Sequence, residues 1–230
     1  MNRMSFTLQT KAGENPLVLT YQNLFAIGYA GRNMEKTLAH IRELEEELGV
    51  PAPKKIPTIF QCSNLLLTQD ETFHVVGEKT SGEVEYVIVT DNDKLYIGVG
   101  SDHTDRALES VSVLKSKQVC PKPIGKMLWD YEEIKDHIDQ IRIRSWQILN
   151  GQKIVYQDGV LADILPADKI LGELKSRVGG IGNAVIFSGT VPLKEGFRYG
   201  QTFTGELADE KLGRTISCQY NVIFISEEER

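Results

Sequence analysis

Two predicted β-hairpins are the strongest constraint on the fold of this chain. Residues 140–159 read QIRIRSWQILNGQKIVYQDG, in which Asn150 and Gly151 separate two strand-like segments. The Asn-Gly pair favours a type I′ turn, because both central residues of that turn need a positive φ. A second hairpin is predicted where GEVEYVIVT, residues 82–90, is followed by DNDK and LYIGVG. The centre of the chain is therefore predicted to be antiparallel sheet.

Further strands and interspersed helices are predicted on both sides of these hairpins. Short apolar segments within residues 5–30 favour strands, and AVIFSGTVP and RTISCQYNVIFIS are expected to complete the sheet. Residues 33–49 are the clearest helix, with Asn33 as its N-cap and Gly49 at its end. Because no βαβ rhythm and no internal repeat is present, we predict an α+β fold.

Two shorter helices are also predicted. DRALESVSVLKSK, residues 105–117, is expected to be helical, with Asp102 or Thr104 as its cap. LPADKILGELKSRVG has proline near its start and glycine at its end, as helices often do.

Composition indicates a folded protein without a basic binding face. The chain has 230 residues, of which 41% are hydrophobic, and a formal charge of -6. This charge disfavours partners such as nucleic acid or a membrane surface, because their binding proteins usually display a basic face. No apolar run approaches the ~20 residues of a membrane span, and the three cysteines are scattered like reduced thiols. We expect a cytoplasmic protein that acts on a small molecule or a protein.

Three carboxylates are candidates for a metal site. Glu83 and Glu85 lie two apart on a predicted strand, so their side chains share one face. Asp102 follows the next strand of the same hairpin, and a site made only of carboxylate oxygens suits Mg²⁺ or Mn²⁺. The alternatives are a solvated strand face for the two glutamates and a helix N-cap for Asp102.

Other polar residues could supply acid–base or anion-binding groups. His40 and Glu43 lie at i and i+3 of the predicted helix and could form a base with its orienting carboxylate, although both could also be surface residues. One of Lys115, Lys117 and Lys122 could provide a cation over a substrate carboxylate or oxyanion. Gly189 and Thr190 end a predicted strand, where backbone amides and a hydroxyl can hold an anion.

Taken in order, these segments resemble the fumarylacetoacetate hydrolase superfamily, whose members use a divalent metal to cleave, decarboxylate, isomerise or hydrate small oxo acids. GYAGRNMEKTLAHIREL resembles the family's lid segment, which makes His40 and Glu43 the implied lid dyad. GEVEYVIV resembles the Glu-x-Glu metal strand, and GSDHTDRALES resembles the segment with the third ligand and an arginine. The resemblance thus implies metal ligands at Glu83, Glu85 and Asp102, and a binding role for Arg106.

The remaining motifs extend the resemblance over residues 25–222. LKSKQVCPKPIG resembles the family's lysine segment and implies a substrate-facing Lys115, while VYQDG resembles the Gln-x-Gly hairpin. FSGTVP resembles the Thr-Gly-Thr-Pro loop, which implies substrate contacts from Gly189 and Thr190. Cys62 stands where the family usually has lysine, so this chain represents a divergent branch.

The resemblance implies a mostly antiparallel β-roll or sandwich with a few peripheral helices. We expect residues 1–56 to form a hairpin unit and lid helix and residues 57–230 the catalytic roll, or both to form one continuous domain. The implied activity is hydrolysis of a small oxo acid or dicarbonyl compound by a homodimer that uses Mg²⁺, or Mn²⁺ or Ca²⁺. The alternatives are decarboxylation, hydration or isomerisation at the same site, a non-catalytic binding protein, and a structural dimer with ordinary surface carboxylates.

Overall fold

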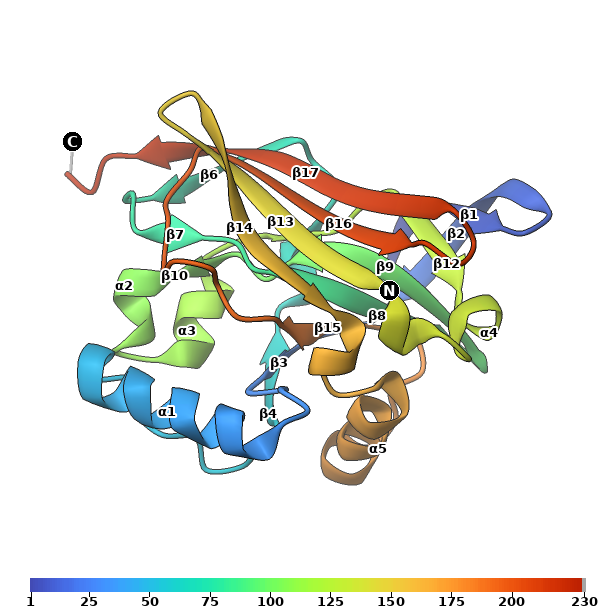
Figure 1. The fold of residues 1–230 in the computed structure, drawn as a ribbon, viewed down its shortest axis with the longest axis horizontal. Helices are drawn as coiled ribbons and strands as arrows, with labels where there is room; N and C mark the ends of the chain where they lie inside the picture. Colours follow the sequence, from blue (N-terminus) through green and yellow to red (C-terminus); the bar gives the residue numbers. More distant parts are fainter. Residues whose placement is uncertain (229–230) are drawn as a thin grey trace.

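Two β-sheets face each other and enclose the main core of the protein (Figure 1). The computed structural model describes residues 1–228, apart from the side chains of His40, Glu47 and Leu48. The larger sheet has eight strands in the order β2 (Gly13–Tyr21), β1 (Asn2–Thr10), β12 (Met127–Asp130), β9 (Lys94–Ser101), β8 (Val84–Asp91), β15 (Ala184–Thr190), β3 (Asn23–Gly28) and β4 (Thr58–Cys62). The smaller sheet has the order β14 (Gln152–Val160), β13 (Arg142–Leu149), β16 (Thr202–Asp209), β17 (Arg214–Ile225) and β6 (Thr72–Val76).

Short pairs of strands and peripheral helices complete the fold. β10 (Thr104–Asp105) pairs with β7 (Thr80–Ser81), and β11 (Lys122–Pro123) pairs with β5 (Leu67–Thr68). The α-helices are α1 (Met34–Leu48), α2 (Arg106–Glu109), α3 (Val113–Gln118), α4 (Tyr131–Ile134) and α5 (Ala167–Val178). Single 3₁₀ turns are η1 (Asn64–Leu66), η2 (Ile138–Gln140) and η3 (Leu161–Asp163). Mixed, mostly antiparallel sheets with few helices confirm the predicted fold class.

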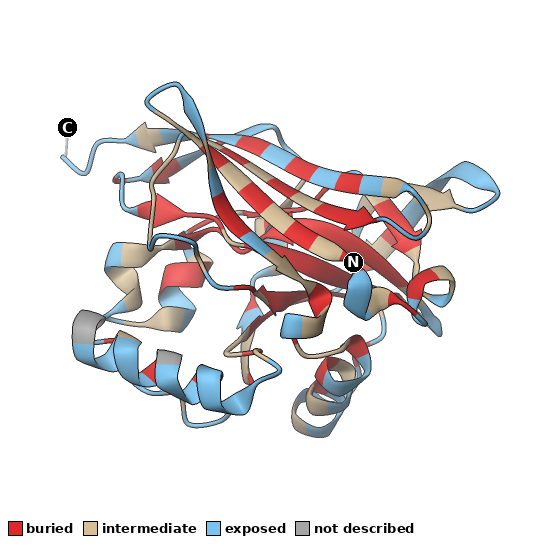
Figure 2. Ribbon diagram, viewed as in Figure 1, coloured by how far each residue is buried: buried red, intermediate tan, exposed pale blue. Residues whose placement is uncertain are grey.

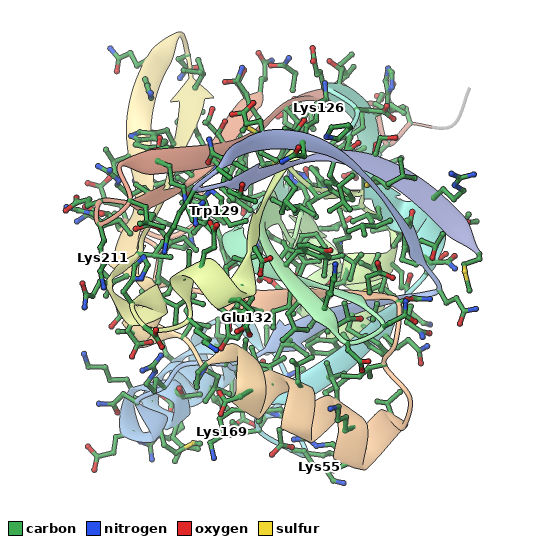
Figure 3. The ribbon with its side chains drawn as sticks, turned by 90° about the vertical axis from the view of Figure 1, so that its right-hand side faces the viewer. Lys55, Lys126, Trp129, Glu132, Lys169 and Lys211 are labelled. Atoms are coloured by element: carbon green, nitrogen blue, oxygen red, sulfur yellow. The ribbon has the colours of Figure 1, made fainter. Side chains whose placement is uncertain are left out.

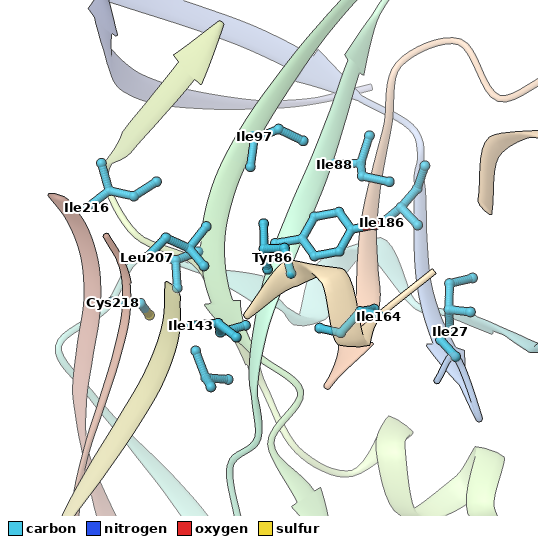
Figure 4. Close-up of a cluster of buried hydrophobic side chains, with 14 of the residues drawn as sticks. Ile27, Tyr86, Ile88, Ile97, Ile143, Ile164, Ile186, Leu207, Ile216 and Cys218 are labelled. Atoms are coloured by element: carbon cyan, nitrogen blue, oxygen red, sulfur yellow. The ribbon is translucent and has the colours of Figure 1, made fainter. Parts of the chain in front are cut away.

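The core lies between the two sheets because each contributes one apolar face. Along β13 and β17 buried residues alternate with more exposed ones, the period of a half-buried strand (Figure 2). Tyr86, Ile88 and Ile97 of the larger sheet meet Ile143 and Leu207 of the smaller sheet (Figure 4). β8 is buried on both of its faces, since a second apolar cluster fills the opposite side of the larger sheet. Glu85, which lies on β8, is accordingly buried and only 2% exposed.

The strongest local patterns of the sequence are confirmed. α1 has Asn33 as its N-cap, with Oδ1 accepting a hydrogen bond from the backbone N–H of Lys36, and Gly49 follows it at φ 66°. Asn150 and Gly151 have φ values of 51° and 77°, as the type I′ turn requires. The strands on both sides of this turn pair over their full length, with one bulge.

The helix expected over residues 105–117 differs from the structure in two respects. It is split into α2 and α3, and the caps are Asp105 and Ser112 instead of Asp102 or Thr104. Asp105 Oδ1 accepts from the backbone N–H of Leu108 at 2.9 Å. The carboxylate of Asp102 is therefore not used for capping.

Charge on the outer surface is ordinary for a protein of this composition. Lys126 before β12, Glu132 on α4 and Lys169 on α5 are exposed and project outward (Figure 3). None of the helices built from described residues is apolar over a length that could cross a membrane. Residues 1–56 contribute β1, β2 and β3 to the larger sheet, and the domain boundary expected near residue 57 stays a prediction.

Candidate functional site

Glu83, Glu85 and Asp102, which we call the carboxylate set, lie at adjoining ends of β8 and β9. In this antiparallel pair Val84 is opposite Ser101 and Glu85 is opposite Gly100. Asp102 follows β9 directly, and its backbone N–H donates to the carbonyl of Glu83 at 3.1 Å. The hairpin register thus brings the three residues to one corner of the sheet, as the sequence pattern predicts.

Two lysines neutralise Asp102. Lys117 Nζ donates to Asp102 Oδ2, and Lys122 Nζ lies 3.2 Å from Oδ1. Both ammonium groups are buried, with 6% and 0% of the residue exposed. Burial alone would raise the pKa of Asp102, but the charges of Lys117 and Lys122 outweigh it and hold the pKa below its usual range. Asp102 is therefore ionised and doubly ion-paired.

Lys122 also ties the surrounding backbone together. Its Nζ donates to the carbonyl oxygens of His103 and Lys117 at 2.6 Å each and to that of Cys120 at 3.2 Å. These bonds join the loop after β9 to the end of α3. Because a buried ammonium group needs such partners, Lys122 acts as a structural support for Asp102.

Glu85 is a buried carboxylate without a cation of its own. It is 2% exposed, and its Oε2 accepts a hydrogen bond from the backbone N–H of Gly189 at 2.9 Å. None of the ion pairs among the described residues includes Glu85. Burial, followed by the charge of Asp102, raises its pKa well above the usual range. Glu85 is thus the member of the carboxylate set for which the described residues provide no ion-pair partner.

Gly189 can hold Glu85 only because it lacks a side chain. Its φ is 88°, and a Cβ atom there would lie 2.7 Å from Cβ of Ala30 and 2.9 Å from the carbonyl oxygen of Ile27. The expected substrate contact of Gly189 stays a prediction, since its amide donates to Glu85 in this structure.

Arg106 is held by two carboxylates, a serine and a ring. Its guanidinium lies 3.2 Å from both Glu83 and Glu109, and its Nε donates to Ser81 Oγ at 2.8 Å. The ring of Phe197 covers it, with 4.5 Å between Cζ and the ring centroid. Burial alone would lower the pKa of Arg106, but Glu83 and Glu109 raise it. Arg106 thus fixes the loop around Glu83, and the substrate-binding role implied for it stays a prediction.

Thr190 is connected to the carboxylate set through Gln157. Its Oγ1 donates to the carbonyl of Val84, between the two glutamates, and accepts from Gln157 Nε2 at 2.7 Å. The fully buried Gln157 amide also donates to the carbonyl of Val191 and accepts from the N–H of Val84 and the hydroxyl of Ser145. The sequence pattern did not single out Gln157 as a site residue, although Gln157 begins the Gln-x-Gly motif of VYQDG.

Gln157→Leu is expected to lower the free energy of unfolding by about 2–4 kcal/mol. Leucine fills a similar volume but leaves buried backbone groups of Val84 and Val191 unpaired, and each such group costs about 1–3 kcal/mol. Urea denaturation measures the loss. The control is Gln152→Leu, an exposed position on the same strand, with an expected change within about 0.5 kcal/mol. Equal stability of the two variants would contradict this role for Gln157.

The lysine expected to face the substrate lies outside the site. Lys115 is exposed on α3, whereas Lys117 on the same helix is buried against Asp102. Residues two apart on a helix point in widely different directions, because each residue turns the helix by about 100°. The structure therefore brings Lys117 to the carboxylate set and leaves Lys115 in solvent.

The lid dyad cannot be placed from its side chains. The side chain of His40 lies outside the described part of the structure, and Glu43 is exposed on α1. The roles expected for His40 and Glu43 stay predictions.

The carboxylate set fits a divalent cation by its chemistry. Its donors are hard carboxylate oxygens, which suit Mg²⁺ or Ca²⁺. In residues 1–228 as described, no three acidic, histidine or cysteine side chains are grouped closely enough to hold a metal ion. Lys117 instead provides the positive charge at Asp102 and Arg106 provides it at Glu83. A metal ion bound here would compete with Lys117 for Asp102.

Solved structures of other proteins share this architecture. Cg1458 is 15% identical, with a TM-score of 0.66 over 94% of this chain and 83% of that protein. A 2-keto-3-deoxy-D-arabinonate dehydratase, solved with magnesium and 2,5-dioxopentanoate, is 17% identical, with a TM-score of 0.61 over 95% and 79%. Yeast ynq8, a fumarylacetoacetate hydrolase family protein, is 16% identical, with a TM-score of 0.62 over 88% and 92%.

These likenesses confirm the resemblance to the fumarylacetoacetate hydrolase superfamily at the level of the fold. No curated protein matches the sequence significantly. A sequence profile, by contrast, matches residues 27–220, which include every element of the site described above. On this match the chain belongs to the DUF2848 family, described as a protein of unknown function.

Proposed function

We propose that this protein is a divalent-metal-dependent enzyme that hydrolyses a small oxo acid or dicarbonyl compound, or carries out related enol chemistry on it. The observation that supports this proposal best is the buried, cation-free carboxylate of Glu85 beside Asp102. Such a carboxylate is costly to ionise unless a cation binds it. The dehydratase of the same fold that was solved with magnesium and a dioxo acid adds independent support.

Glu83, Glu85 and Asp102 would hold the ion, which we take to be Mg²⁺. When bound, the ion would supply Lewis-acid polarisation of the substrate's keto or enol oxygens. The N–H of Gly189 would keep Glu85 oriented, and Lys122 would do the same for Asp102. The three side chains would still have to move closer together, and Asp102 would have to exchange Lys117 for the ion.

Lys117 would take the substrate-facing role in place of Lys115. Its ammonium group is already buried at Asp102, so a metal ion there would leave it beside the ion with its charge uncompensated. A substrate carboxylate or developing oxyanion would replace Asp102 as the partner of that charge. His40 and Glu43 would deliver water or move a proton when α1 closes over the site.

Hydration or its reverse is the second candidate reaction. It is favoured by the dehydratase among the proteins of similar fold, and decarboxylation or isomerisation would use the same groups. A homodimer remains an expectation from the family resemblance, and a cytoplasmic location remains one from the sequence composition.

Titration of chelator-treated protein with Mg²⁺ tests the metal site. We expect saturable binding by calorimetry and a rise in melting temperature, because a ligand that binds only the folded state stabilises it. Absence of binding to Mg²⁺, Mn²⁺ and Ca²⁺ would refute the proposal. It would also favour a structural role for the carboxylates.

A turnover assay separates an enzyme from a binding protein. The metal-loaded protein is incubated with an acylpyruvate, oxaloacetate and a hydroxymuconate-type compound, and the products are followed by ultraviolet absorbance and mass spectrometry. We expect turnover of at least one compound, lost in His40→Ala and Glu43→Ala. Metal binding without any turnover would identify a non-catalytic binding protein.

A further inference from the structure

A pocket lies beside Lys117 and has no part in the metal site. Its volume is about 210 Å³, and its walls include Tyr29, Phe60, Pro51, Pro53, Val113 and Leu114. Tyr29 follows β3, Phe60 lies on β4, the two prolines follow α1, and Val113 and Leu114 begin α3. We call this space the side pocket. An engineered apolar cavity of about 150 Å³ holds benzene, so the side pocket has room for a group of several carbons.

Phe60 and α3 connect the side pocket to the carboxylate set. The Phe60 ring centroid is 5.5 Å from Lys117 Nζ, and Lys117 is ion-paired with Asp102. Val113 and Leu114 lie on the first turn of the helix that carries Lys117 on its second. A molecule held by Lys117 therefore has the side pocket immediately next to it.

Tyr29 also lines the side pocket, and it senses the charge of nearby acidic groups. Burial, followed by the negative charge of Glu109, raises its pKa, and Lys117 acts in the other direction. Its φ of 53° is unusual for a residue with a Cβ atom and is unfavourable for the backbone. The fold keeps this strained conformation at the border between the side pocket and the carboxylate set.

Close packing between Gly28 and the ring of Phe60 shapes the wall of the side pocket next to Tyr29. A Cβ atom at Gly28 would lie 2.7 Å from Cε2 of Phe60, so the ring packs directly on the backbone of β3. The position of the ring thus depends on the glycine that precedes Tyr29.

The walls of the side pocket carry no formal charge. Its other lining residues, Thr58 and Ser112, already use their hydroxyl groups locally: Thr58 donates to the carbonyl of Lys55, and Ser112 accepts from the N–H of Lys115. Glu109, Lys117 and Glu83 act on Tyr29 by their charge, but none of the three lines the pocket. A second carboxylate placed in this pocket would meet a largely apolar wall, with no cation in the lining to pair with it.

We propose that the side pocket binds the uncharged end of the substrate, which makes the substrate a monocarboxylic oxo acid with an apolar chain or ring. This inference rests on the proposed function, because it places the oxo-acid end at Lys117 and the metal ligands. Dicarboxylic oxo acids are then poor ligands. Each added methylene group that enters the pocket should strengthen binding about threefold to fourfold, because burying one methylene group contributes roughly 0.8 kcal/mol.

A homologous series of ligands measures this effect directly. Binding of pyruvate, 2-oxobutanoate, 2-oxopentanoate, 2-oxohexanoate and phenylpyruvate to the Mg²⁺-loaded protein is compared with that of oxaloacetate and 2-oxoglutarate by calorimetry. We expect affinity to rise along the series and both dicarboxylates to bind more weakly than 2-oxohexanoate. A flat series, or tighter binding of oxaloacetate, would overturn the inference.

Two substitutions of Leu114 test whether the apolar chain of the ligand binds in the side pocket. Leu114 is 42% exposed, so Leu114→Asp and Leu114→Lys should fold. We expect both to abolish the rise along the series while pyruvate binding is kept, and Leu114→Lys to strengthen oxaloacetate binding. Val111→Asp is the matched control, because Val111 is 74% exposed and does not line the side pocket. A rise that persists in both Leu114 variants would overturn the assignment of this pocket.

The outcomes also separate the two proposals. If the protein binds Mg²⁺ and pyruvate but shows no rise along the series, only the side-pocket inference fails. If no oxo acid binds to the Mg²⁺-loaded protein, both the proposed function and the inference fail.

Discussion

Replacing Glu85 with glutamine is expected to abolish Mg²⁺ binding while leaving the metal-free protein at least as stable as the wild type. Burial and the charge of Asp102 raise the pKa of Glu85. A carboxyl group whose pKa is higher in the folded than in the unfolded state loses folded-state stability as the pH rises through that interval. At neutral pH a neutral amide therefore removes a cost, and its oxygen can still accept from the N–H of Gly189.

Thermal melts without Mg²⁺ measure the stability of the metal-free variant, and melts with Mg²⁺ measure whether the ion still binds. The wild type should gain about 2.7 kcal/mol of stability at a hundredfold excess over Kd, and Glu85→Gln should gain none. Glu132→Gln is the control, since Glu132 is an exposed carboxylate far from β8 in the sequence and should keep the full gain. If Glu85→Gln retained wild-type Mg²⁺ affinity, Glu85 would not be a ligand.

Lys117→Met is expected to lower kcat/KM by about 10²–10³ without weakening Mg²⁺ binding, since one preorganised charge at an oxyanion contributes about that much. Asp102 keeps Lys122 at 3.2 Å in this variant, so its charge stays paired. Removal of Lys117 also removes a competitor of the metal ion at Asp102. Mg²⁺ affinity should therefore be equal or higher.

The measurement pairs steady-state kinetics, on whichever substrate the turnover assay identifies, with calorimetric titration of Mg²⁺. Lys115→Met on the exposed face of the same helix should match the wild type in both. Loss of Mg²⁺ binding in Lys117→Met would show that Lys117 supports the metal site instead of the substrate. Equal activity losses in the two variants would contradict the choice of Lys117.

Much of the fold could be predicted because its signals are local. The Asn150-Gly151 turn needs positive φ at two successive residues, and the helix over residues 33–49 is bounded by its own cap residues. The placement of the carboxylate set could be predicted for a similar reason, whereas its metal-binding role stays a prediction. Its members lie at neighbouring ends of one hairpin, so strand register alone brings them together.

The sequence near the lysines could not show which of them faces the carboxylate set. Which face of α3 a lysine occupies depends on where that helix begins, and the predicted cap at Asp102 or Thr104 was wrong. With Ser112 as the cap, Lys117 turns inward and Lys115 outward. The spacing of the lysines in the sequence does not by itself show which side of the helix faces the core.

The amino-acid sequence by itself determined the sheet-rich fold, its hairpins, its main helix and the three acidic residues at one sheet corner, because periodicity, turn chemistry and register are short-range properties. Only the tertiary structure decided which groups surround that corner. Gln157 reaches Val84 across 73 residues, and Gly189 reaches Glu85 across 104. The wall of the side pocket joins β4 and α3 to residues that follow β3 and α1. Such contacts form when distant segments are buried together, and burial also sets the charge balance that distinguishes Glu85 from an ordinary glutamate.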